Sequence, residues 1–304
     1  MARALFAVAI ASLLVSSLAR AEEVIDMEQA DPIASPPAPE ENEPTQPSED
    51  DDPKQMILRR LVKAKGNLVG SPNLLFGRSP YLTPAGMTTV TAEALRVYAA
   101  AGFTNTVTGG AAYSMVLNDG IDGVGFSARG PLTLFGSIEL VHKGPLSVVA
   151  GGDLVLNFAG ANQTTEVSVR GGATARLTLW KLIALYTGSP LAGTPQARQL
   201  SLGFYDKGRS SLSLPLGVAV QATPSVYAFA ETTIFEIFFV NAPQDASGNT
   251  QRTRLVFSDI TPLTFGAYYS STGRMDLGGS FTFPDLGSPG YLVFTLGARF
   301  HTGP

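Results

Sequence analysis

The stretch GYLVFTLGARF, residues 290–300, decides how this chain folds. Side chains of a β-strand point alternately to its two faces, so every second residue shares a face. One face of this stretch is wholly apolar and carries Leu292, Phe294, Leu296, Ala298 and Phe300. The opposite face carries Tyr291, Val293, Thr295, Gly297 and Arg299. The pattern predicts a strand with one face in an apolar environment and the other in a polar one.

The same alternation recurs along the chain, in residues 132–140, 166–177, 211–221 and 274–283, and no charged residue occurs on the apolar faces. Turns containing proline separate the strands, because proline lacks the amide donor that a strand ladder needs. Two longer polar stretches, 187–198 and 241–253, are expected to be exposed loops. Short turns and longer loops in alternation are typical of an up-and-down barrel of about 12 strands, with a range of 10–14.

Charge content separates a membrane barrel from a soluble β-sandwich or lipocalin, whose strands also have one apolar face. Residues 54–304 contain 32 charged side chains, about 13 per cent, whereas ordinary soluble domains have roughly a quarter. A lipid-facing arginine or lysine near the bilayer centre costs about 2–4 kcal/mol, which explains such scarcity. The sequence therefore predicts an all-β fold, an antiparallel transmembrane β-barrel over residues 86–300 with a tail at 301–304.

The first 85 residues differ in character from the body. Residues 1–21 read as a secretory signal peptide cleaved after Ala21, and they imply export. Residues 22–53 hold twelve acidic residues, seven prolines and no basic residue, so we expect a disordered linker. Residues 54–66 mix basic and apolar side chains and predict a short basic helix on an anionic surface or under a barrel mouth, with the rest of 54–85 as a lead-in.

An apolar face that runs up to an aromatic residue near the C-terminus resembles the closing strand of Gram-negative outer-membrane β-barrel proteins, a broad porin-like group. The resemblance implies that Phe300 belongs to the assembly signal, although His301–Pro304 follow it here. Residues 79–86 are also similar to the entry into the first strand of many such barrels. The resemblance implies an outer-membrane location, and the expected partners are membrane lipid, lipopolysaccharide and the barrel-assembly machinery. A periplasmic partner of the acidic linker is a further expectation.

If the apolar face meets lipid, the alternate positions face the barrel interior. The predicted lumen-lining residues are Arg129, Glu139, Asp153, Glu166, Arg170, Arg176, Glu231, Arg274, Asp276 and Arg299. Buried charges must pair or stay hydrated, so two outcomes remain open. The charges line a water-filled pore that weakly prefers anions, or they pair into a network that plugs a narrow barrel. Residues 54–304 carry 13 acidic and 19 basic residues, a net charge of +6. This excess is much smaller than that of a typical nucleic-acid-binding domain, so no nucleic-acid partner is expected.

The function predicted first is therefore a passive porin-like channel. The alternatives are a closed structural or adhesive barrel that anchors a periplasmic tether and, third, a lipid-modifying barrel enzyme. Serine–histidine catalysis needs a histidine beside the nucleophile, and the chain has only His142 and His301, both expected at the barrel rim. No nucleophile motif, cysteine, metal-ligand spacing or phosphate loop occurs, so no catalytic residue, metal or cofactor is expected.

Overall fold

The computed structural model describes residues 53–83, 86–118, 130–157, 166–188, 201–205, 209–241, 253–257, 261–287 and 290–302. All of them belong to one compact unit, residues 47–304. The predicted signal peptide, the acidic linker up to residue 52 and the tail beyond Thr302 lie outside the described residues. No helix in the described part of the chain has the length and hydropathy to cross a bilayer.

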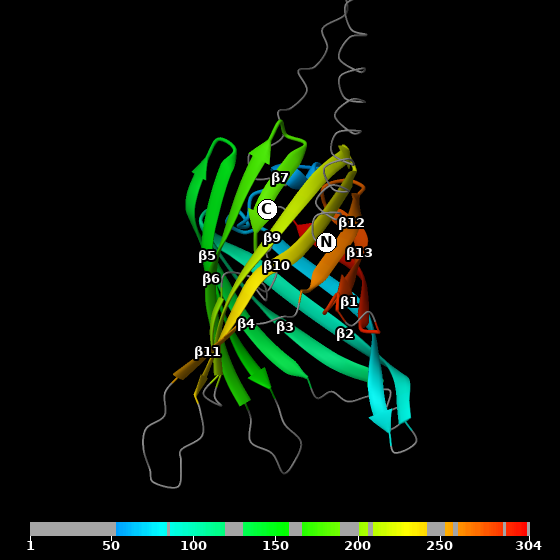
Figure 1. Ribbon diagram of the computed structural model, residues 1–304. Coiled ribbons are helices and arrows are strands. Elements are labelled where there is room, and N and C mark those ends of the chain that lie inside the picture. The colour runs from blue at the N-terminus through cyan, green and yellow to red at the C-terminus, as the bar shows by residue number, and fades with distance from the viewer. Residues whose placement is uncertain are drawn as a thin grey trace, which may run out of the picture. The chain divides into compact units, whose positions relative to one another are not determined.

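A single antiparallel sheet contains every strand segment of the described chain (Figure 1). The segments are β1 (Leu68–Thr83), β2 (Gly86–Thr104), β3 (Val107–Asn118), β4 (Pro131–Lys143), β5 (Leu146–Asn157), β6 (Glu166–Leu179), β7 (Ile183–Thr187), β8 (Ser201–Tyr205), β9 (Arg209–Thr223), β10 (Val226–Asn241), β11 (Thr253–Phe257), β12 (Leu263–Ser270), β13 (Met275–Phe283) and β14 (Leu292–Thr302). Pairing of β14 with β1, from Leu68 opposite Thr302 to Arg78 opposite Leu292, closes the sheet into a barrel.

Fourteen segments make twelve strand positions, because two positions are interrupted. β7 and β8 both pair with β6 and with β9, at successive heights, so they form one broken strand. β11 and β12 share β10 as a partner in the same way. The predicted transmembrane-type barrel of about twelve antiparallel strands is confirmed.

The two faces of the wall differ as the alternation predicts. Leu296 and Phe300 of β14 lie on the outer face and are 50% and 49% exposed, whereas Arg299 between them is 3% exposed on the inner face. Large apolar side chains are exposed all around the outside, among them Leu74, Leu134, Val169, Leu216, Phe265 and Leu277. An outer surface of this kind matches the apolar belt that a barrel presents to hydrocarbon. A water-soluble sandwich with these side chains packed against one another is excluded.

Five short connections lie at one end of the barrel, which we call the short-turn end (Figure 1). They join β2 to β3, β4 to β5, β6 to β7, β9 to β10 and β12 to β13, and β1 begins and β14 ends there. At the opposite end the connections vary in length, from residues 84–85 and 206–208 to the longer 119–130 and 242–252. This arrangement places the start of β1 and the end of β14 at the same end.

Two boundary predictions were wrong. The only helical element in the described chain is a single 3-10 turn, η1 (Met56–Leu58), so residues 54–66 are not a helix. The barrel begins at Leu68 rather than at residue 86 and continues to Thr302 rather than ending at residue 300. Pro72 and Pro80 interrupt the alternation pattern of β1, which made this strand read as a lead-in.

Candidate functional site

Seven of the predicted lumen residues lie on the inner face of the barrel wall. They are Glu139 (β4), Asp153 (β5), Arg170 and Arg176 (β6), Glu231 (β10), Asp276 (β13) and Arg299 (β14). Their side chains are buried except that of Arg170, which is 20% exposed. Register explains the placement, since alternate positions of a closed sheet point to one side. Whether they line an open pathway remains a proposal.

The other predicted residues fall elsewhere. Arg129 lies outside the described residues, and Glu166 begins β6, but its side chain is not described. Arg274 is exposed in the turn that precedes β13, because the strand starts one residue later, so its assignment to the lumen is corrected. Phe300 lies on the outer face, opposite Gly70 and Met275, and its role as an assembly signal stays a prediction.

Residues 53–67 occupy the interior at the short-turn end, and we call them the N-terminal plug. Figure 1 shows this blue segment among the strand ends that carry the short turns. Met56, Ile57, Leu61 and Val62 of the plug are almost completely buried. Arg59 and Lys63 are also buried. Their charges therefore do not lie on a membrane surface, which was one of the two positions expected for this segment.

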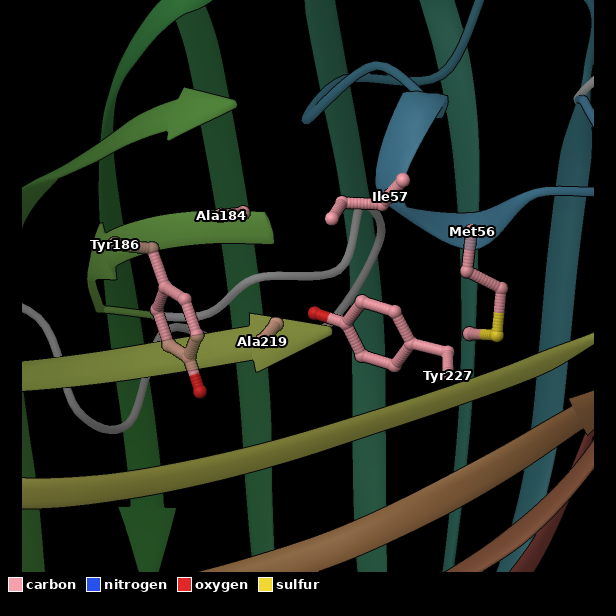
Figure 2. Close-up of a cluster of buried hydrophobic side chains, with 6 residues drawn as sticks. All are labelled: Met56, Ile57, Ala184, Tyr186, Ala219 and Tyr227. Carbon is pink, nitrogen blue, oxygen red and sulfur yellow. The ribbon is translucent and has the colours of Figure 1, made fainter. Parts of the chain in front are cut away.

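Apolar contacts hold the first part of the plug against one side of the barrel. Met56 and Ile57 pack in a cluster with Tyr186 of β7 and Tyr227 of β10 (Figure 2). The small residues Ala184 and Ala219 complete this cluster and leave room for the plug side chains. The Ile57 amide donates to Oε1 of Gln221 at 3.1 Å, so the turn's backbone is also satisfied by the wall. Each buried aliphatic side chain of this size contributes roughly 1.5–3 kcal/mol.

An ion pair fixes the plug to the adjoining part of the wall, at β12 and β13. The Arg59 guanidinium donates to both carboxylate oxygens of Asp276, with distances of 2.6 and 2.9 Å, and to Oγ of Ser270 at 2.8 Å. Arg59 Nε also donates to the carbonyl of Pro53 at 2.8 Å, which curls the start of the plug around the guanidinium. Bidentate charge-assisted hydrogen bonds of this geometry are among the strongest in proteins.

His301 links the same carboxylate to a second plug cation. Its Nε2 lies 2.7 Å from Oδ2 of Asp276, and its Nδ1 lies 2.9 Å from Nζ of Lys63. An ammonium group only donates, so Nδ1 accepts from Lys63 and Nε2 donates to Asp276. His301 is therefore an interior residue of β14, and the prediction that it lies at the rim was wrong, because β14 extends past Phe300.

Contacts with β3, β4 and β6 hold the remaining plug. Arg60 pairs with Oε2 of Glu139, whose side chain is almost fully buried. The amide of Lys63 donates to Oγ1 of Thr108 at 2.7 Å, and Arg176 donates to the carbonyl of Arg59. The plug thus contacts the wall on every side of the short-turn mouth.

The plug joins the wall through a close backbone approach at Gly102 of β2. The Gly66 amide donates to the Gly102 carbonyl and the Gly102 amide donates to the Asn67 carbonyl, both at 3.0 Å. A Cβ atom on Gly102 would lie 2.0 Å from the carbonyl oxygen of Ala64, so only glycine fits here.

A second charged group lies farther from the short-turn end. Arg170 pairs with Asp153 at 3.0 Å, its direct partner in the register of β5 and β6. The charge of Arg96 on β2 interacts with both. Sequence reasoning missed Arg96, although it alternates with Tyr98 and Ala100, two inner-face residues of the same strand.

His142, Ser147 and Glu139 are three residue types found in hydrolases, and they lie together. Nδ1 of His142 is 3.0 Å from Oγ of Ser147 and 3.6 Å from Oε1 of Glu139. A catalytic relay needs the nucleophile and the carboxylate on opposite ring nitrogens, whereas both face Nδ1 here. The described residues also contain no cluster of His, Cys, Asp and Glu side chains suited to a metal ion.

Comparison with known proteins gives structural matches alone, since no family model and no curated protein matches the chain. An outer membrane channel from Pseudomonas putida F1 is similar, with a TM-score of 0.50 and 11% identity over 84% of this chain and 99% of that one. The KdgM porin (TM-score 0.43, 7% identity, 76% and 98% covered) and the NanC porin (0.43, 12%, 75% and 98%) also match. At such identity the Pseudomonas structure shows a shared fold.

Proposed function

We propose that this protein is a passive, porin-like channel of the outer membrane, with its short-turn end toward the periplasm. The observation that carries the proposal is the closed twelve-strand barrel with an apolar belt outside and paired charges inside. A polar inner face suits a barrel through which water and ions pass, because it can replace part of their hydration. The similarity to the fold of an outer membrane channel supports this assignment.

Arg170 is an interior cation well placed to act on passing ions, since it is more exposed than Arg176 and Arg299 and lies beyond the plug. Its partner Asp153 offsets only one of the two positive charges in the group with Arg96. We therefore infer a preference for anions over cations.

The test is ion conductance of the refolded full chain in planar bilayers under a salt gradient. Arg170→Gln is expected to move the reversal potential toward cation preference, because the group loses a positive charge. Arg78→Gln is the matched control, since Arg78 lies exposed on the outer face of β1, and it should leave the reversal potential unchanged. The channel proposal is contradicted if neither the wild type nor Arg59→Gln conducts ions although heat-modifiable barrel is present in the bilayer.

The plug itself favours a second candidate, a permanently closed structural barrel. This alternative predicts that no change at the plug opens a conducting path. The enzyme alternative is not supported by the geometry at His142, and His142→Ala should leave the lipid composition of reconstituted vesicles unchanged.

A further inference from the structure

We infer that the N-terminal plug is a displaceable gate that keeps the channel closed, with the Arg59–Asp276 contact as its latch. This inference rests on the proposed channel function. It assigns a role to residues that a passive pore does not require.

Closure follows from where the plug lies. Its contacts reach Thr108, Glu139 and Arg176 on one side and Ser270, Asp276 and His301 on the other. Tyr186 and Tyr227 close the third side against Met56 and Ile57 (Figure 2). A segment that is buried against all these walls leaves ions little room to pass through the short-turn mouth.

Displacement follows from how the plug is attached. In the described chain, its backbone-to-backbone bonds with the wall lie at its C-terminal end, where Gly66 and Asn67 meet Gly102. The earlier plug residues contact the wall through side chains, including Gln221, Thr108 and Asp276. The plug can therefore leave without breaking any strand pairing.

A flexible glycine and a latch made of charged side chains complete the proposed gate. Gly66 has a φ of +82°, a left-handed conformation favoured by glycine, and nothing lies within 4 Å of a Cβ built there. The latch consists of charged groups that water hydrates once the plug moves out, which offsets part of the cost of breaking it. The buried apolar contacts of Met56 and Ile57 favour the closed state, so the plug is expected to be closed most of the time in the wild type.

The experiment compares the wild type with Arg59→Gln in planar bilayers, with the full chain and heat-modifiable migration as the folding control. Loss of the bidentate contact should raise the open fraction about tenfold or more. The size of each conductance step should stay the same, because the barrel wall sets it. Arg78→Gln should behave as the wild type.

A tether in the Arg59→Gln background makes the test internally controlled. Val62 of the plug and Val149 of β5 share one buried cluster with Leu61, and the chain has no native cysteine. Val62→Cys with Val149→Cys, joined by a reducible bifunctional thiol reagent, should close the channel, and reduction in the same bilayer should reopen it.

The outcomes separate the two proposals. Equal open fractions in the wild type and Arg59→Gln, unaffected by the tether, overturn the gate and leave the channel standing. If neither protein conducts although the folded barrel is inserted in the bilayer, the channel and the gate are both overturned. Conductance that rises with Arg59→Gln and falls with the tether supports both.

Discussion

Individual charged residues show how the interior of the barrel is neutralised. Asp276 is fully buried on β13, directly opposite Arg299 in the register with β14. Its carboxylate also accepts hydrogen bonds from Arg59 of the plug and from His301. Arg299 in turn donates through Nε to the hydroxyl of Tyr98 at 2.9 Å. Buried ionic groups need this density of partners, since an uncompensated charge is costly.

Asp276→Asn should lower the free energy of unfolding by about 2 kcal/mol or more, because charge-assisted hydrogen bonds to two plug-linked groups are lost. Urea unfolding of the refolded barrel measures this change. Arg59→Gln combined with Asp276→Asn should cost less than the sum of the single changes, since both remove one interaction. Strict additivity would show that the two residues do not interact. Asp285→Asn, in the connection after β13, is the matched control and should be close to neutral.

At the scale of elements, glycines decide where the plug and the wall approach. Gly102 of β2 lies against the Lys63 and Ala64 carbonyls, and Gly217 of β9 lies against the ring of Tyr186, where a Cβ would be 2.2 Å from Cζ. These glycines sit in strands, where they ordinarily weaken packing. Their positions follow from the need to fit a chain segment and a large aromatic side chain inside the barrel.

Gly102→Ala should displace the attached end of the plug, because the new methyl group would meet backbone atoms at 2.0 and 2.6 Å. In the Gly102→Ala background, we expect the cysteine introduced by Val62→Cys to react faster with a water-soluble maleimide. We also expect the channel to be open for a larger fraction of the time in bilayers. Gly70→Ala is the matched control, since its Cβ would find only the Tyr98 carbonyl, at 3.9 Å. Equal thiol reactivity in the two backgrounds would contradict a tight junction at Gly102.

At the scale of the whole molecule, the outer surface and the interior are separated by the alternation of a closed sheet. Ile138, near the middle of β4, and Leu146, the first residue of β5 after the short turn, are both exposed on the outside. A bilayer around the barrel should distinguish these two depths, whereas water should not.

Ile138→Arg should destabilise the barrel in lipid vesicles by about 2–4 kcal/mol, and Leu146→Arg by about 0–1 kcal/mol, because the cost of a lipid-facing arginine falls toward the interface. Reversible urea unfolding in vesicles measures both values. Equal costs at the two positions would show that hydrocarbon does not surround this wall.

Much of the barrel was predictable from local features of the chain. The period of two in residues 290–300 and its repeats placed Arg176, Asp276 and Arg299 on the inner face, because strand geometry alone dictates that alternation. β1 was harder to recognise, since two prolines disturb its pattern. Arg96 of β2 was not predicted, because alanines at positions of both faces blur the alternation of this strand.

The sequence by itself determined the strand periodicity, the apolar outer belt and hence the closed barrel, because these depend on neighbours one or two residues apart. Only the tertiary structure decided that residues 53–67 lie inside the barrel and that His301 is interior. The contacts responsible join residues 217 and 238 positions apart, Arg59 with Asp276 and Lys63 with His301. No local pattern encodes such pairs, since they form only when the pairing of β1 with β14 brings residues 53–67 and the end of β14 to one mouth.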